Sequence, residues 1–131
     1  MAFIRFTQSG RSFAAKASIS RTGMLSLNDG ARRRFGIDRF KYCVLYYDPD
    51  TRRVGMEFTD DAEAEGVRKV RLRKTGADVA ARSFVDFFDL GIRETTAFPV
   101  ERDEGTGYLV IDLAQGTERV TRASPESATD N

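Results

Sequence analysis

The residues of this chain that could do chemistry are mainly its arginines and lysines, which gather in two segments. Residues 1–41 hold nine Lys and Arg against two Asp, and residues 67–82 hold six against one. Residues 42–66 and 83–131 are acidic, so the net charge of +1 hides strong segregation. Clustered cations neutralise phosphates and release counterions, which favours binding of nucleic acid. The candidate contact residues are Arg11, Lys16, Arg21, Arg32, Arg33, Arg34, Arg71, Arg73 and Lys74, with Tyr47 as a candidate stacking residue.

The sequence contains few of the residue types that catalyse reactions in enzymes. The chain has no His and a single Cys, Cys43, which excludes Ser-His-Asp or Cys-His hydrolysis and a structural zinc site. Carboxylates that could bind a divalent metal lie in a predicted hairpin tip and a polar loop, where acidic residues are usually solvated. We therefore expect a protein that is not an enzyme and has no cofactor. The carboxylates weighed for this role are Asp48, Asp50, Asp60, Asp61, Glu63 and Glu65.

The elements that must position the cations are mostly strands. The first helix is predicted over residues 29–35, with Asn28 as its cap and Gly36 as its stop. A second helix is predicted over 83–90, with Ser83 and Asp86 as a capping box. Apolar runs bounded by turn residues predict strands at 2–7, 13–20, 24–27, 42–47, 54–58, 67–73, 78–81, 96–101 and 108–113, the last two paired as a hairpin.

The order of these elements recurs along the chain. Arg21-Thr22-Gly23 corresponds to Lys74-Thr75-Gly76, and Gly36-Ile37 corresponds to Gly91-Ile92. The pattern predicts an α+β fold in which two β-α-β-β repeats, about 13–58 and 67–113, form one antiparallel-sheet-rich domain with two short helices. Two ordinary β–α–β segments remain the alternative. We expect residues 1–114 to form this single domain, and the polar composition of 115–131 predicts a disordered tail.

Location and membrane contact follow from simple features. No apolar run approaches the ~20 residues that span a bilayer. The first ten residues lack the pattern of a signal peptide. One cysteine cannot form an internal disulfide, and we expect Cys43 to be a buried, inert thiol. These features predict a cytoplasmic protein without a membrane partner.

Residues 19–58 resemble the AbrB/MazE-type swapped-hairpin family of DNA-binding domains. The residues that carry the resemblance are a strand and glycine turn over 19–27, then Ala31-Arg32, Phe35-Gly36-Ile37 and a closing hairpin over 44–58. The resemblance implies transcription-factor or antitoxin-like DNA binding, with two repeats in place of two chains. It implies that Arg21 contacts DNA. For Arg32, it is equally compatible with DNA contact and with a structural role in the helix. Asn28 replaces the family's helix-start Pro, and Asp38-Arg39-Phe40-Lys41 replaces its Gly-Asp.

The order of helices and strands is also similar to a permuted Whirly-type single-stranded DNA-binding fold. Such folds hold bases on aromatic side chains. Phe13, Tyr46 and Tyr47 are candidate stacking platforms, although alternation along a strand places only one of the two tyrosines outside.

Two functions are compatible with this charge pattern. The first is binding of nucleic acid, DNA before RNA, through the first strand and glycine turn of each repeat, for example in transcription regulation. The alternative is a protein-interaction or assembly module in which basic and acidic surfaces join copies into a homo-oligomer. The basic surface requires the two glycine turns to lie side by side, and charges that pair internally with the acidic hairpins would remove it.

Overall fold

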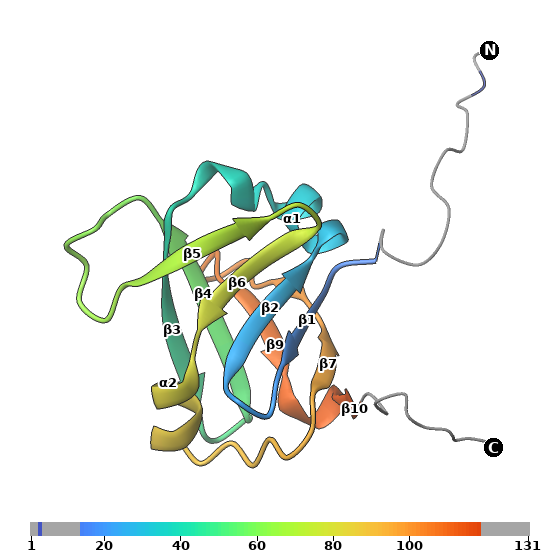
Figure 1. The fold of residues 1–131 in the computed structure, drawn as a ribbon, viewed down its shortest axis with the longest axis vertical. Coiled ribbons are helices and arrows are strands. Elements are labelled where there is room, and N and C mark those ends of the chain that lie inside the picture. Colours follow the sequence, from blue (N-terminus) through green and yellow to red (C-terminus); the bar gives the residue numbers. More distant parts are fainter. Residues whose placement is uncertain (1–2, 4–13, 119–131) are drawn as a thin grey trace.

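The computed structural model describes residue 3 and residues 14–118, which form an antiparallel sheet with two short helices (Figure 1). The strand-rich α+β fold expected from the sequence is confirmed. The sheet has ten strands in the order β10-β7-β1-β2-β6-β5-β3-β4-β9-β8. The elements are β1 (Lys16–Ile19), β2 (Met24–Asn28), α1 (Asp29–Phe35), η1 (Ile37–Arg39), β3 (Tyr42–Asp48), β4 (Arg53–Thr59), β5 (Arg68–Arg73), β6 (Gly76–Ala80), α2 (Arg82–Phe87), β7 (Thr96–Pro99), β8 (Glu101–Arg102), β9 (Leu109–Asp112), η2 (Leu113–Gln115) and β10 (Thr117–Glu118).

The sheet curls on itself, so that its two ends meet. The chain passes from β7, near one end of the strand order, to β8, at the other end, through Val100 alone. Val100 is buried and donates its backbone N–H to the carbonyl of Ala15. One residue spans only about 3.4 Å, so the two ends of the sheet must lie side by side.

Two strand pairings bring together parts of the chain that have the same charge. β2 pairs with β6, which joins the two basic segments. β4 pairs with β9, which joins the two acidic segments. The segregation of charge along the sequence therefore becomes segregation in space. We call β1, β2, β5 and β6 with their turns and α1 the basic half, and β3, β4, β8 and β9 with their turns the acidic half.

The core fills the inside of the curl. Its largest fully buried side chains come from most strands and include Phe98, Ile19, Leu25 and Met56. Burial of one such side chain contributes about 1.5–3 kcal/mol. This core makes the sheet a rigid support for the side chains on its outer face.

Local chemistry explains α1 better than α2. The Asn28 side chain accepts a hydrogen bond from the Ala31 N–H, and Gly36 ends the helix in the left-handed conformation, so the predicted cap and stop are confirmed. The capping box predicted for α2 is wrong, because α2 starts after Ala81 without a side-chain cap. Ser83 instead accepts a hydrogen bond from Arg68, which ties α2 to β5. Neither helix is long and apolar enough to cross a membrane.

The C-terminal strands also differ from the prediction. The expected hairpin of 96–101 with 108–113 is present only at its tip, where Glu101 and Arg102 of β8 pair with β9. The rest is wrong, because β7 pairs with β1 and β10 while β9 pairs with β4 on its other side. The break falls at Val100, whose N–H bonds to Ala15 and leaves the ladder of β8. Residues 115–118 complete η2 and form β10, and the rest of the predicted tail lies outside the described residues. The strand predicted at 2–7 lies outside them too, except for Phe3.

The one cysteine is buried in β3, as the sequence predicts. Cys43 is fully buried, and burial raises the pKa of its thiol to about 12, with the charge of Glu57 as a second cause. We expect iodoacetamide at pH 8 to modify it at least roughly a hundredfold more slowly in the native protein than in denaturant, because only the thiolate reacts. Mass spectrometry of timed samples measures both rates, and equal rates would contradict the burial.

Candidate nucleic-acid interface

The outer face of the basic half is a polar surface bordered by cations. Residues paired across antiparallel strands share a face, and the registers place Ser18, Ser26, Asp78 and Arg71 in one row. The same face of β5 carries Lys69 and Arg73 on either side of Arg71, and all three are exposed. Lys69 was not among the candidates, although the alternation of residues 68–73 indicates it.

The two glycine turns lie at opposite ends of this face. Met24, directly after the first turn, is opposite Ala80, whereas Gly76, at the end of the second turn, is opposite Asn28. Four strand residues rise by roughly 14 Å, so the turns are about that far apart. The side-by-side arrangement that the sequence suggested is therefore wrong, because antiparallel pairing of β2 with β6 points the two hairpins in opposite directions. Arg21 and Lys74 belong to different ends of the molecule.

Most of the candidate cations gather at the end of the basic half where α1 lies. Figure 1 shows α1 beside the β5–β6 turn, with the start of β1 close by, and α2 at the opposite end of the sheet. Exposed cations reach this α1 end from β1, α1, β5 and the β5–β6 turn. They are Lys16 at the start of β1, Arg33 and Arg34 on α1, Arg73 at the end of β5 and Lys74 in the turn.

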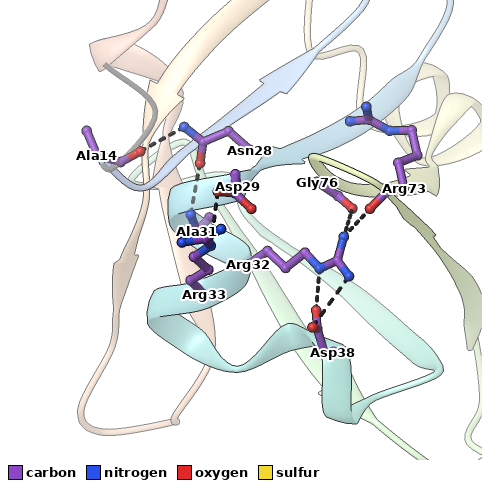
Figure 2. A network of polar contacts seen from close by, with 9 residues as sticks. All are labelled: Ala14, Asn28, Asp29, Ala31, Arg32, Arg33, Asp38, Arg73 and Gly76. Carbon is purple, nitrogen blue, oxygen red and sulfur yellow. Dashed lines mark hydrogen bonds and ion pairs between the residues drawn. The ribbon is translucent and has the colours of Figure 1, made fainter. Parts of the chain in front are cut away.

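Arg32 holds the α1 end together (Figure 2). Its guanidinium donates hydrogen bonds to the backbone carbonyls of Arg73 and Gly76, and it forms an ion pair with Asp38. The hydrogen bond to Asp38 raises the pKa of Arg32 above its ordinary value. With its donors committed to the protein, Arg32 positions α1 against the β5–β6 turn, and the structural role that the sequence left open is the one its contacts support.

A conservative substitution tests this role. Arg32→Lys keeps the charge, but one ammonium group cannot reach two carbonyls and a carboxylate in the planar arrangement of a guanidinium. We expect a lower melting temperature by circular dichroism. Arg34→Lys, on the exposed side of the same helix, is the matched control and should leave the melting temperature unchanged. Equal melting temperatures for the two variants would contradict the role of Arg32.

Asn28 fixes the position of β1 relative to α1. Its side-chain amide donates to the Ala14 carbonyl at 2.7 Å, and its carbonyl oxygen accepts from the N–H of Ala31 (Figure 2). The same oxygen also accepts from the N–H of Lys16. The same residue therefore caps the helix and anchors the strand that carries Lys16. The Lys16 side chain stays exposed.

The cations of the basic half are not neutralised by the acidic half. The part of the chain that the structure describes contains five ion pairs, and none joins the two halves. Arg33 pairs with Asp29 in the same helix, and Arg73 pairs with Asp78, which also accepts a hydrogen bond from Ser26. Within this described part, no ion pair involves Lys16, Arg21, Arg34, Arg71 or Lys74, and their exposed charges can meet a ligand.

The aromatic candidates lie away from these cations. Tyr47 is half-buried and packs against Phe84 and Phe88 of the α2 region, at centroid distances of 6.5 and 5.0 Å. Its neighbour Tyr46 is the exposed one of the two, on the outer face of the acidic half. Arg11 and Phe13 lie outside the described residues.

Comparisons with known proteins assign no function to this surface, so its function is inferred from its side chains. No protein-family model, curated protein or solved structure matches this chain. Among residue 3 and residues 14–118, no group of three or more Cys, Asp or Glu is placed to hold a metal ion. The strongest feature of the described surface is the set of exposed cations on the basic half.

Proposed function

We propose that this protein binds nucleic acid, with DNA as the first candidate, through the outer face and the α1 end of its basic half. One observation carries the proposal: the β2–β6 pairing joins the two basic segments, and the acidic half pairs with none of their cations among the described residues. Exposed lysine and arginine side chains bind phosphates without reference to base sequence. We therefore expect binding dominated by the phosphate backbone.

The composition of this face favours duplex over single-stranded DNA. Binding of single strands uses aromatic side chains as stacking platforms among the cations. The strands β1, β2, β5 and β6 contain no Phe or Tyr, and apart from Met24 their outward residues are small, polar or charged. A face of this kind supports contact with phosphates and offers nothing for unpaired bases to stack on. Duplex DNA is therefore the preferred ligand in this proposal.

Reciprocal packing supports an internal duplication of β-α-β-β units. β2 pairs with its proposed equivalent β6, and β4 pairs with its equivalent β9. Arg32 of α1 bonds to the turn of the second unit, while the N–H of Ala81, just before α2, bonds to Gly23 in the turn of the first. This exchange fits the swapped-hairpin resemblance, and we extend the proposal to a cytoplasmic DNA-binding regulator built as a pseudo-dimer.

The deciding experiment measures binding of labelled random-sequence DNA, double- and single-stranded, by fluorescence anisotropy at low and moderate salt. Binding of duplex that weakens with salt supports the proposal. Tighter binding of single strands would overturn the duplex preference. If neither form binds at low salt, the DNA-binding function is wrong.

A further inference from the structure

The outer face of the acidic half contains a hollow of about 460 Å³. Its floor follows a row of residues paired across four strands: Tyr46, Gly55, Val110 and Glu101. Gly55 has no side chain, and a Cβ added to it would lie 3.3 Å from the ring of Tyr108. The hollow therefore exists because glycine and valine occupy the middle of the row.

One side of the hollow is a pair of stacked tyrosine rings. The ring centroids of Tyr46 and Tyr108 are 4.6 Å apart, and the angle between the two ring planes is 5°. The Tyr46 hydroxyl donates a hydrogen bond of 2.6 Å to Glu57, which holds the ring in place and raises the pKa of the phenol. Tyr46 is still 37% exposed, so part of the pair faces solvent. Aromatic rings present negative charge on their faces, which attracts cations.

The rest of the lining adds negative charge. The hollow is lined by two arginines and by four carboxylates, those of Asp48, Glu101, Asp103 and Asp112. One of these arginines, Arg53, forms an ion pair with Asp112, and the distance from its Nε to Asp112 Oδ2 is 3.9 Å. Glu101 is exposed, and within the described residues no hydrogen bond or ion pair of its side chain is seen. Aromatic rings together with surplus carboxylates fit an organic cation such as a guanidinium or ammonium group.

We propose that the hollow receives an arginine or lysine side chain from the basic half of a second copy of this chain, so that copies associate head to tail. The two halves complement each other: residues 67–82 hold six Lys and Arg against one Asp, and residues 42–66 hold seven Asp and Glu against two Arg. Arg71 and Lys74 cannot fill the hollow of their own molecule, since β3 and β4 separate β5 from β9 in the sheet. A contact between two different surfaces leaves one of each free at the ends, and the assembly can therefore extend.

The test measures mass by sedimentation velocity without DNA, so its outcome does not depend on the proposed function. Wild-type protein is expected to associate at about 20 mM salt and to be monomeric at about 300 mM, because salt screens exposed charges. Two variants remove one surface each: Glu101→Lys/Glu104→Lys on the acidic half, and Arg71→Ala/Lys74→Ala on the basic half. Glu101 lines the hollow and Glu104 is exposed in the adjoining β8–β9 turn, and the alanines give the introduced lysines no new partner. Each variant alone should stay monomeric at low salt, while circular dichroism confirms its fold.

Mixing the two variants gives the sharpest result. The first variant keeps an intact basic half and the second an intact acidic half, so an equimolar mixture should form a dimer that cannot grow. Glu63→Lys/Glu65→Lys makes the same charge change in an exposed loop outside the hollow and should still associate. Tyr108→Leu keeps the bulk of the side chain and should weaken association roughly two- to fivefold through loss of the cation–π contact.

Three outcomes would overturn the inference. Wild-type protein that is monomeric at both salt concentrations has no such contact. Association that survives Glu101→Lys/Glu104→Lys uses another surface, for which the exposed Phe87 and Phe88 of the α2 region are the first candidates. A mixture of the two variants that remains monomeric would show that the two halves do not meet.

Discussion

Duplex DNA is expected to lose affinity for this protein by about a hundredfold between about 50 and about 200 mM salt. The estimate rests on about four phosphate contacts, each of which releases counterions from the duplex and steepens the dependence on salt. Four exposed cations near the α1 end are available for these contacts without an ion pair in the described residues: Lys16, Arg34, Arg71 and Lys74. Titrations at four or more salt concentrations give the slope directly.

Removing two of these cations should flatten the slope. Arg71→Ala/Lys74→Ala is expected to lower the slope of log affinity against log salt by about 1.8, and to weaken binding at low salt roughly tenfold or more. Arg52→Ala/Arg93→Ala removes the same charge from exposed positions outside the basic half and is the matched control. If both double variants lose affinity equally, net charge rather than the basic half governs binding.

The two ends of the basic half can be told apart by single substitutions. Arg21 lies at the α2 end and Lys74 at the α1 end, because β2 and β6 run antiparallel. A greater loss in Lys74→Ala than in Arg21→Ala would place the duplex at the α1 end, where the cations are denser. The reverse result would favour Arg21, the contact that the swapped-hairpin resemblance implies.

Local chemistry could be predicted from the sequence wherever neighbouring residues decide the structure. Asn28 and Gly36 set the two ends of α1 through bonds and backbone angles within the helix and its caps. In the turn between β3 and β4, the Thr51 hydroxyl donates a hydrogen bond to the carboxylate of Asp48, three residues earlier. These features need no knowledge of the rest of the chain.

Pairing between distant segments could not be predicted in the same way. A hairpin of 96–101 with 108–113 has the right local pattern, but the curl of the sheet gives β7 a better partner in β1. The orientation of the two glycine turns depends on whether β2 and β6 pair with each other and whether they run parallel or antiparallel, and no short-range signal decides this. The basic face was therefore predicted by composition, while its layout required the structure.

The candidate site shows the same division. Alternation along β3 requires that Tyr46 and Tyr47 face opposite sides, and packing against Phe84 and Phe88 decides which of them points inward. Three successive arginines on α1 point in different directions, and the carbonyls of the β5–β6 turn decide that Arg32 turns inward. The role of a side chain cannot be predicted from the sequence when it depends on a partner that lies far away along the chain.

The two turn glycines recur for a reason that only the packing reveals. A Cβ at Gly76 would lie 2.2 Å from the carbonyl oxygen of Leu27 on β2, and a Cβ at Gly23 would lie 2.5 Å from the Cα of Arg82 on α2. Gly23 also has a φ of 88°, which disfavours any other residue. In both turns the glycine lets the hairpin approach the backbone of the other proposed repeat. Both glycines therefore lie where two segments distant in the sequence come into close backbone contact.

Alanine at either turn glycine is expected to cost about 3 kcal/mol of unfolding free energy, because a methyl group cannot fit without moving backbone. Two other glycines separate the causes. Gly91 has a φ of 72° and no atom within 4 Å of a Cβ, so Gly91→Ala should cost only about 1 kcal/mol of backbone strain. Gly105→Ala meets only Asp103 Oδ2 at 3.6 Å and should fall within about 0.5 kcal/mol of wild type.

Urea unfolding of the four alanine variants orders these effects. The close backbone approaches require Gly76→Ala and Gly23→Ala to be the least stable, Gly91→Ala intermediate and Gly105→Ala unchanged. If Gly76→Ala is as stable as Gly105→Ala, β6 does not approach β2 as closely as the register implies, and the joining of the two basic segments loses its support. The stability of one glycine variant thus tests the same β2–β6 contact on which the proposed DNA surface depends.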